Sequence, residues 1–462
     1  MCAASQGQPG TRRCGTMADP GQEWTALDAV ESVYDRFVSP LTGVVNSLYN
    51  QLHETDDIPG YAVGARACDG APVIGAPVNE LNGGGALSYR AAKVAAIGET
   101  IERYSAAYMP DDLFFRSDAP GTADSAFRYD WNLFHSRQYE EEDFPFAPLT
   151  PDTPTLWTWA RDIGTQQQLA VPADLVYLRP LKSTGATVAY ATSNGVACSL
   201  TMPEALVSAI LEAFERHAFM LTWHATLTPP LIDGPTLFRT SPFWHDHVEP
   251  TNLDVRLFAL SELVGVPTVL AVVLNTATAS APISFGAASA PTISRAAEKA
   301  TVEAFQTRVW IKAEQRSRNT IRFDSDWRKT IHSFDDHVRL YAGPNQDPLW
   351  KAISFLTDAT EEEPHPERFD LPSGLGPSDS VKELVAIARR RDVELFNVDV
   401  TSPDVRDEGV VVVKVLSPQL MQLDASYVGR FLGNPALYSP LPWGHGSGGD
   451  FDTLNPIPHP FP

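Results

Sequence analysis

The amino-acid sequence predicts a mixed α/β (α+β) protein. Three long glutamate-containing segments, at 88–108, 203–223 and 294–316, show the apolar spacing of helices, and shorter runs of β-branched residues typical of strands lie between and after them. Such a mixture is expected to form sheets with helices packed on their faces. Hydrophobic residues make up 43% of the 462 residues and aromatic residues 10%, which is enough for a large core and excludes a disordered chain.

The predicted elements follow one another in an irregular order. Residues 1–22 are small and polar and are expected to form a disordered tail, whereas residues 23–59 have helix-like apolar spacing with a break at Pro40. We expect this helical segment to precede a main domain at 60–432 and a proline-rich tail at 433–462. The further elements expected in the main domain are a strand-like region ending in glycines 83–85, loops and short strands over 110–190, a strand with a glycine turn at 191–199, strands within 255–274, an acidic linker at 361–370, a helix at 380–391, and strands at 393–400 and 410–416.

The charge and the apolar content narrow the possible classes of function. Lys and Arg number 35 and Asp and Glu number 57, and the resulting net charge of −22 disfavours binding to nucleic acid or to an anionic membrane surface. The longest apolar stretch, 264–274, is too short to span a bilayer, and the N-terminus lacks the apolar core of a secretory signal. Four widely spaced cysteines indicate neither a disulfide framework nor a zinc site. We therefore expect a cytoplasmic protein.

The three long helices carry related acidic motifs. The pattern Glu-x-x-Glu-Arg begins at Glu99 in the first helix and at Glu212 in the second, each time after a glycine-bearing turn, and the third helix contains Glu-Ala-Phe-Gln-Thr-Arg from Glu303. Residues three or four apart share a helix face, so the glutamates of each motif lie together. Their neighbours on that face are alanine and serine, which would let a ligand approach the backbone. An ordinary solvated face would normally carry long charged residues instead.

These motifs indicate a Mg–nucleotide site assembled from helices. Carboxylates are the hard oxygen ligands that suit Mg²⁺, and arginines between them would contact phosphate oxygens. The simpler alternative is a solvated charged face. The sequence contains no P-loop motif, and its one G-x-G-x-x-G pattern, at 444–449, has no predicted strand before it and no helix after it.

In combination and in this order, the motifs resemble those of the YcaO domain family. The resemblance covers roughly residues 60–462 and is carried by the segments 84–88, 95–105, 192–197, 204–205, 212–216, 303–308, 399–405 and 434–435. It implies mixed sheets and long acidic helices that line a P-loop-independent ATP site. By position, the residues implied to hold Mg²⁺ are Glu99, Glu102, Glu212, Glu215 and Glu303, and those implied to bind or orient ATP are Arg103, Asn194, Glu204, Arg216, Gln306 and Arg308. The family often has Lys-Gly where this chain has Gly85-Ala86, which removes one phosphate contact.

The proline-rich end has two interpretations. By composition, the seven prolines of residues 433–462 indicate an exposed polyproline II ligand for another protein. Family members that make azolines often end in P-x-P-x-P, with the terminus in the active site, and Pro458, Pro460 and Pro462 match that pattern. The Pro462 carboxylate would then act as an acid/base or orienting group, and His459 is either catalytic or a spacer.

The resemblance implies an ATP- and Mg²⁺-dependent cyclodehydratase of natural-product biosynthesis. Its substrate would be a ribosomal precursor peptide whose Cys, Ser or Thr side chain attacks the preceding amide carbonyl; phosphorylation of the amide oxygen and loss of phosphate would give a thiazoline or (methyl)oxazoline. We expect a separate ThiF-like or leader-peptide-binding partner protein, a flavin dehydrogenase where the rings are oxidised, and a homodimer. The alternatives are a YcaO enzyme that forms thioamides or amidines, a non-catalytic ATP-binding scaffold subunit, and an unrelated module recruited through its tail.

Overall fold

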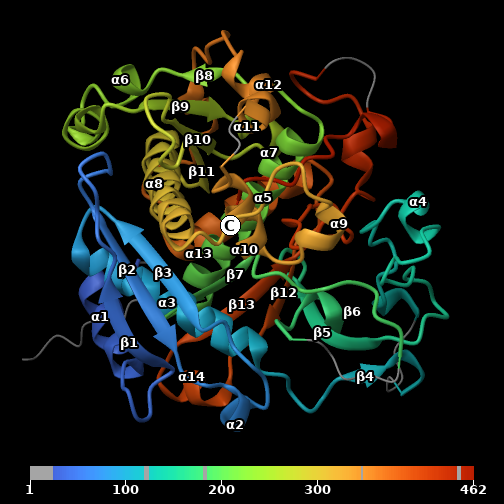
Figure 1. Cartoon of the computed structure of the whole chain (residues 1–462). Helices are drawn as coiled ribbons and strands as arrows, with labels where there is room; N and C mark the ends of the chain where they lie inside the picture. The colour runs from blue at the N-terminus through green and yellow to red at the C-terminus, as the bar shows by residue number, and fades with distance from the viewer. Residues whose placement is uncertain (1–23, 119–123, 180–184, 345–346, 445–448, 462) are drawn as a thin grey trace, which may run out of the picture.

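The computed structural model describes residues 24–118, 124–179, 185–344, 347–444 and 449–461. The tail predicted at 1–22 and the terminal Pro462 lie outside these ranges. The chain forms three antiparallel sheets separated by long helices (Figure 1), and the mixed α+β architecture is confirmed. Among the described residues, no helix combines the length and apolar character needed to cross a membrane.

The first sheet lies in the N-terminal part of the described chain. Its strand order is β1 (Val45–Asn50), β2 (Tyr61–Ala67) and β3 (Leu81–Ala86), and helix α3 (Tyr89–Ala107) packs on it. The close approach of α3 requires glycine at position 84, because a Cβ there would collide with the backbone of the helix at Ala92 and Ala96. The predicted glycine-rich strand end therefore has a packing role.

The helix predicted across 23–59 is only partly correct. Helix α1 occupies Leu27–Tyr34, but β1 is a strand that pairs with β2 across the boundary expected at residue 60. Val45 is fully buried opposite Ala67. A β-branched residue at the start of a half-buried strand fits the pleated sheet, so this pairing overrides the helix-like apolar spacing.

The other two sheets contain the later strands. The six-stranded sheet has the order β4 (Phe114–Phe115), β5 (Leu156–Asp162), β12 (Phe396–Asp399), β13 (Val411–Leu416) and β7 (Val196–Ser199), with β6 (Gln168–Pro172) paired to β5. The four-stranded sheet has the order β11 (Ile283–Ser289), β10 (Thr268–Leu274), β9 (Asp254–Ala259) and β8 (Leu231–Ile232). Helix α8 (Ile293–Ser317) packs on β10 and β11 and also reaches β3.

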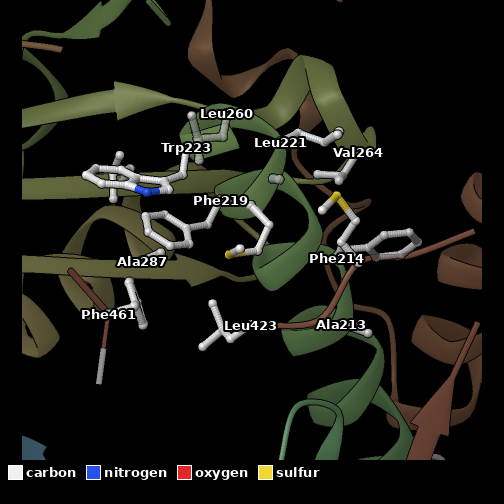
Figure 2. Packing of buried hydrophobic residues seen from close by; sticks show 14 of the residues in the cluster. Ala213, Phe214, Phe219, Leu221, Trp223, Leu260, Val264, Ala287, Leu423 and Phe461 are labelled. Atoms are coloured by element: carbon white, nitrogen blue, oxygen red, sulfur yellow. The ribbon is translucent and has the colours of Figure 1, made fainter. Parts of the chain in front are cut away.

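Helix α5 (Met202–His224) runs through the middle of the molecule (Figure 1). It contacts β7 and β13 of one sheet, β11 of another, and helix α13 (Pro377–Arg390). Most of its side chains are buried, as expected for a helix that is apolar around most of its circumference. Figure 2 shows part of the core around it, in which Phe214, Phe219 and Trp223 pack with residues from the sheet and the loops.

The predicted long helices are confirmed as α3, α5 and α8, and the predicted helix at 380–391 as α13. Shorter helices complete the described fold: α2 (Ala71–Ile74), α4 (Ser136–Tyr139), α6 (Gly234–Leu237), α7 (Ser261–Val264), α9 (Trp327–Thr330), α10 (Phe334–Tyr341), α11 (Asp347–Ala352), α12 (Ser354–Thr357) and α14 (Pro403–Asp407). The acidic linker predicted at 361–370 includes a 3-10 turn at Pro366–Phe369.

Candidate functional site

Arg216 of α5 joins glutamates from two helices. Its Nε lies 3.3 Å from Glu215 Oε1 and 3.7 Å from Glu212 Oε1, and its Nη2 lies 3.7 Å from Glu303 Oε1 of α8. Two glutamates of α3 approach the same place, since Glu102 and Glu212 repel one another electrostatically. We call the five carboxylates the acidic recess: Glu99, Glu102, Glu212, Glu215 and Glu303. The five residues predicted to hold Mg²⁺ thus lie within electrostatic range of Arg216 or of one another.

The glutamates of α3 are held by the adjacent strands. Glu99 accepts a hydrogen bond from Gly83 N (3.3 Å) on β3 and pairs with Arg103, with Nη2 at 3.2 Å from Oε1. Glu102 accepts from Cys198 N of β7 at 2.8 Å. The first glycine segment, predicted as a turn, lies within β3, whereas the second is a turn that precedes β7, and each of these strands fixes a carboxylate of the first motif.

The acidic recess is accessible although it lies between helices. The side chains of Glu99, Glu212 and Glu303 keep 33%, 26% and 30% of their surface exposed. Glu215 keeps only 8%. A small ligand can therefore reach three of the carboxylates from solvent, which a structural ion-pair cluster would not require.

The carboxylates of the recess outnumber the cations that neutralise them. Burial raises the pKa of Glu102 to about 8, and repulsion by Glu212 adds to this effect. Burial also raises the pKa of Glu212 to about 7, against the attraction of Arg216. Burial raises the pKa values of Glu215 and Glu303, and repulsion by Glu303 adds to the effect on Glu215, as repulsion by Glu212 does for Glu303. A bound cation would relieve this excess of negative charge.

Lys414 is a site residue that the sequence analysis did not identify. It lies on β13, is fully buried, and donates from Nζ to Thr192 O (2.7 Å) and Asn194 O (2.6 Å). Burial lowers its pKa to about 7, while Glu212 favours its charged form. Lys414 therefore holds the turn that carries Asn194, whose Oδ1 accepts from Leu423 N at 2.6 Å. The only signal in the sequence was a lysine within a run of apolar β-branched residues.

Two of the residues predicted to bind the nucleotide, Glu204 and Gln306, contact other parts of the chain. Glu204 accepts hydrogen bonds from Thr25 Oγ1 (2.9 Å) and Ser199 Oγ (2.8 Å), and so ties the N-terminal segment to the start of α5. Gln306 packs its side chain against Gly85, where a Cβ would collide with it. Both of these bonds reach Oε2 of Glu204, and Oε1 accepts from Thr25 N, so neither carboxylate oxygen is left without a contact.

Arg308 lies in a second charged cluster, away from the acidic recess. Its fully buried guanidinium pairs with Asp56 and donates to Ala281 O. Lys312 Nζ donates to Asp57 Oδ1 at 2.8 Å in the same place. We call this set the loop cluster: Glu54, Asp56, Asp57, Arg308, Lys312 and Arg316. Arg308 therefore anchors the loop before β2, and its geometry does not place it at the recess.

The C-terminal tail reaches the acidic recess. The guanidinium carbon of Arg216 lies 4.5 Å from the ring centroid of Phe461, which is buried and also packs on Phe219 at 4.8 Å (Figure 2). Trp223 Nε1 donates to Ile457 O (2.8 Å), and Tyr341 OH donates to Pro458 O (2.9 Å). Pro458, His459 and Pro460 are buried, so over these residues the exposed polyproline ligand expected from composition alone is incorrect.

The donor set fits Mg²⁺ and phosphate together. Among the described residues, no three acidic, histidine or cysteine side chains come close enough to hold a metal ion by themselves. Mg²⁺, however, is commonly bound by one or two carboxylates, with phosphate oxygens and waters completing its shell. Within the described ranges the buried Nη1 of Arg216 has no hydrogen-bond partner, which leaves a charged donor for an anionic group beside the carboxylates.

Comparison with known proteins agrees with the fold. A family model described as YcaO cyclodehydratase, ATP- and Mg²⁺-binding, matches residues 82–421. A solved heterocyclase in complex with substrate and cofactor superimposes with a TM-score of 0.71 at 18% identity, over 96% of this chain and 59% of its own length. YcaO from Methanopyrus kandleri bound with AMPPCP and Mg²⁺ gives 0.57 at 16% identity, over 86% of this chain and 91% of its own.

A chain of the E. coli microcin synthetase McbBCD complex has the same fold, with a TM-score of 0.50 at 14% identity, over 83% of this chain and 90% of its own length. No curated protein matches the sequence. At these identities the solved structures show a shared fold, and the chain spans about three fifths of the heterocyclase that it resembles.

Proposed function

This chain belongs to the YcaO family of ATP- and Mg²⁺-binding cyclodehydratases, and from this premise we propose that it converts Cys, Ser or Thr residues of a ribosomal precursor peptide into thiazolines or (methyl)oxazolines. The observation that carries the proposal is the contact between the tail and the recess, in which the Phe461 ring covers Arg216. A P-x-P-x-P end directed to a set of carboxylates supports azoline formation rather than thioamide or amidine formation.

The proposed reaction transfers one peptide oxygen to phosphate for each ring. The thiol or hydroxyl of the substrate adds to the preceding amide carbonyl, the amide oxygen receives the γ-phosphoryl group of ATP, and phosphate leaves as the ring C=N bond forms. Mg²⁺, when bound with the phosphates, neutralises charge on the transferring group. The chain itself supplies carboxylates that hold the cation and the free Nη1 donor of Arg216 for a phosphate oxygen.

We propose the following roles for the site residues, which their contacts support. The five glutamates of the acidic recess hold Mg²⁺, and Arg103, Asn194, Arg216 and Gln306 bind or orient the nucleotide. Glu204 and Arg308 act by holding the N-terminal segment and the loop before β2 in place. Pro458 and Pro460 direct the chain end to the recess, so that the Pro462 carboxylate serves there as an acid/base or orienting group.

We further propose that a separate ThiF-like or leader-peptide-binding protein presents the precursor peptide. The similar E. coli chain belongs to the microcin synthetase McbBCD complex, and this supports an arrangement with a separate partner protein. The chain mixed alone with precursor, ATP and Mg²⁺ should give little cyclisation, and addition of the partner should restore it. Full activity of the isolated chain would refute the need for a partner. A second copy of the chain and a flavin dehydrogenase that oxidises the rings complete the proposed system.

Isotope transfer tests the proposed reaction. A precursor peptide with ¹⁸O in its backbone carbonyls, incubated with the chain, its partner, ATP and Mg²⁺, should lose the mass of one water per ring and deliver one ¹⁸O to phosphate. Glu303→Gln should abolish both signals. Glu298→Gln is the matched control, because Glu298 lies on the same helix and pairs with Arg295 at the surface.

Other results of the isotope experiment would support the alternative functions. Substitution of sulfur for oxygen in the product mass would indicate thioamide formation. A loss of water that persists after replacement of every Cys, Ser and Thr would indicate an amidine. ATP binding with neither product nor labelled phosphate, in the presence of the partner, would indicate a scaffold subunit. Each of these results would overturn azoline formation.

A further inference from the structure

The end of the chain contains the same local turn twice. In Asn455–Pro456–Ile457, Asn455 Oδ1 accepts a hydrogen bond from Ile457 N at 3.1 Å. In His459–Pro460–Phe461, His459 Nδ1 accepts from Phe461 N at 3.2 Å. Asparagine commonly bonds the amide two residues later in this way. His459 therefore performs, with a ring nitrogen, the task that Asn455 performs with its amide oxygen.

The hydrogen bonds of His459 define its protonation state. The Nε2 atom lies 3.0 Å from Asp424 O, and a carbonyl oxygen only accepts, so Nε2 carries the hydrogen. The Nδ1 atom must then be free of hydrogen to accept from Phe461 N, and the ring is neutral. Burial lowers the pKa of His459 well below its ordinary value, and the nearby His337 and His224 act in the same direction. The acceptor on Nδ1 is thus preserved at neutral pH.

The surroundings hold the His459 ring in this orientation. His337 of α10 stacks on it, with ring centroids 4.1 Å apart, and donates from Nδ1 to His459 O at 2.8 Å. The carboxylate of Asp424 lies 2.9 Å from His224 Nε2 and accepts from Phe431 N at 2.8 Å. These groups come from α5, α10 and the loop after β13, so three separate parts of the fold converge on one residue of the tail.

We propose that His459 is a positioning residue: its Nδ1 holds the amide of Phe461, and this bond sets the Phe461 ring on Arg216 beside the acidic recess. The bond belongs to the last turn of the described chain, and the packing of the Phe461 ring on Phe219 acts in the same direction. The catalytic consequence rests on the proposed function, whereas the hydrogen bond can be tested without it.

Three substitutions separate the acceptor from the rest of the side chain. His459→Asn places Oδ1 close to the position of Nδ1 and reproduces the turn made by Asn455. Its rate of azoline formation should therefore stay within about threefold of wild type. His459→Gln can retain a donor toward Asp424 O but moves the acceptor, and His459→Leu removes both groups. In these two variants kcat should fall by about 10- to 100-fold, the scale of a small misplacement of a catalytic group, with little change in KM for ATP.

Hydrogen–deuterium exchange of the full-length chain provides the activity-independent readout. A C-terminal peptide covering 454–462 retains amide hydrogens only at 457, 459 and 461 beyond its first two residues, because the intervening positions are proline. His459→Gln and His459→Leu should each expose one more amide to rapid exchange than wild type, and His459→Asn should not. Thermal midpoints, measured in parallel, identify a variant that is simply unfolded, and His459→Gln serves if His459→Leu does not fold.

The outcomes distinguish this proposal from the proposed function. Unchanged exchange at position 461 in the folded Gln or Leu variant would overturn the positioning role, whatever the activity. Increased exchange with wild-type kcat would overturn its catalytic consequence. Increased exchange in the variants, together with a wild-type chain that forms no azoline with its partner present, would refute the proposed function and leave the hydrogen bond established.

Discussion

Helix α8 carries residues of two charged clusters that differ in their balance of positive and negative charge. The loop cluster sets three carboxylates against three cations, and its Arg308 and Lys312 side chains are 0% and 2% exposed. In the acidic recess, ion pairs join only Arg103 and Arg216 to the glutamates among the described residues, and three carboxylates are a quarter to a third exposed. Balanced charge around the buried Arg308 and Lys312 indicates a structural role, whereas an excess of negative charge that solvent can reach indicates a site for a ligand of opposite charge.

The carboxyl pKa values shift in opposite directions in the two clusters. Burial alone would raise the pKa of Asp56, but hydrogen bonding from Lys312 and the charge of Arg308 lower it below the ordinary value. Burial raises the pKa of Glu212 to about 7, and Arg216 does not offset it. A neutralising substitution therefore tests each cluster: it should destabilise the fold in the loop cluster and reduce activity in the acidic recess.

The largest effect on stability is expected in the loop cluster. Arg308→Met should lower the free energy of unfolding by about 3–5 kcal/mol, because it leaves the buried Asp57 without one of its partners. Denaturant titration measures this loss. In the folded fraction, KM for ATP should be unchanged. A fully stable variant with a raised KM would show instead that Arg308 binds the nucleotide directly.

A neutralising substitution in the acidic recess should instead reduce activity and leave stability unchanged or higher. Glu212→Gln should reduce ring formation by at least about 100-fold, since it removes a carboxylate from the charge-stabilising centre. Its thermal midpoint should be equal to or above that of wild type, because one unbalanced negative charge is gone. If activity and stability fell together in proportion, Glu212 would belong to a structural cluster like that of Arg308.

The helices and site residues that depend on a local sequence pattern could be predicted from the sequence. Helical spacing placed α3, α5 and α8 to within one or two residues at most ends, and the repeated Glu-x-x-Glu-Arg motif brought Glu99 and Glu212 to one site. Residues 45–50 were misassigned because strand pairing with β2 is a non-local interaction that outweighs helix-like spacing.

The residues that sequence analysis missed are defined by contacts between distant segments. Lys414 lies in an apolar strand and gains its role only when the turn at 192–194 packs above it. Asp424 and His337 lie 35 and 122 residues before His459, and nothing in the local sequence marks either of them as its neighbour. Arg308 matched the motif, but its partner Asp56 lies in a loop 252 residues earlier in the chain.

The pH dependence of stability should differ between wild type and Glu212→Gln. The folded-state pKa of Glu212, about 7, is above its ordinary value of 4.5, so the folded chain binds this proton more tightly than the unfolded chain. The resulting stabilisation is present below pH 4.5 and is lost as the pH rises through 7. With a metal chelator present, the thermal midpoint of wild type should therefore fall relative to that of Glu212→Gln between pH 5 and 8.

A matched comparison checks this assignment. Glu298→Gln, which changes a carboxylate of α8 paired with the exposed Arg295, should follow wild type across the same pH range. Parallel pH profiles for wild type and Glu212→Gln would contradict the raised pKa and the charge excess inferred from it.

The smallest effect is expected at the rim of the loop cluster. The Arg316 and Glu54 side chains are 59% and 47% exposed, and their 2.7 Å contact is open to solvent screening. Arg316→Met should therefore cost less than about 1 kcal/mol of unfolding free energy, in contrast to Arg308→Met. Denaturant titration of the two variants side by side gives the difference. Equal losses would show that burial does not determine the contribution of a pair in this cluster.

Calorimetry tests most directly whether the acidic recess is the nucleotide site, by measuring the binding of a non-hydrolysable ATP analogue with and without Mg²⁺. Wild type and Glu298→Gln should bind the analogue in a Mg²⁺-dependent manner, and Glu303→Gln should lose that Mg²⁺ dependence while remaining folded. Equal Mg²⁺-dependent binding by Glu303→Gln and wild type would contradict the account, since the carboxylates of the recess would then have no part in holding the ion.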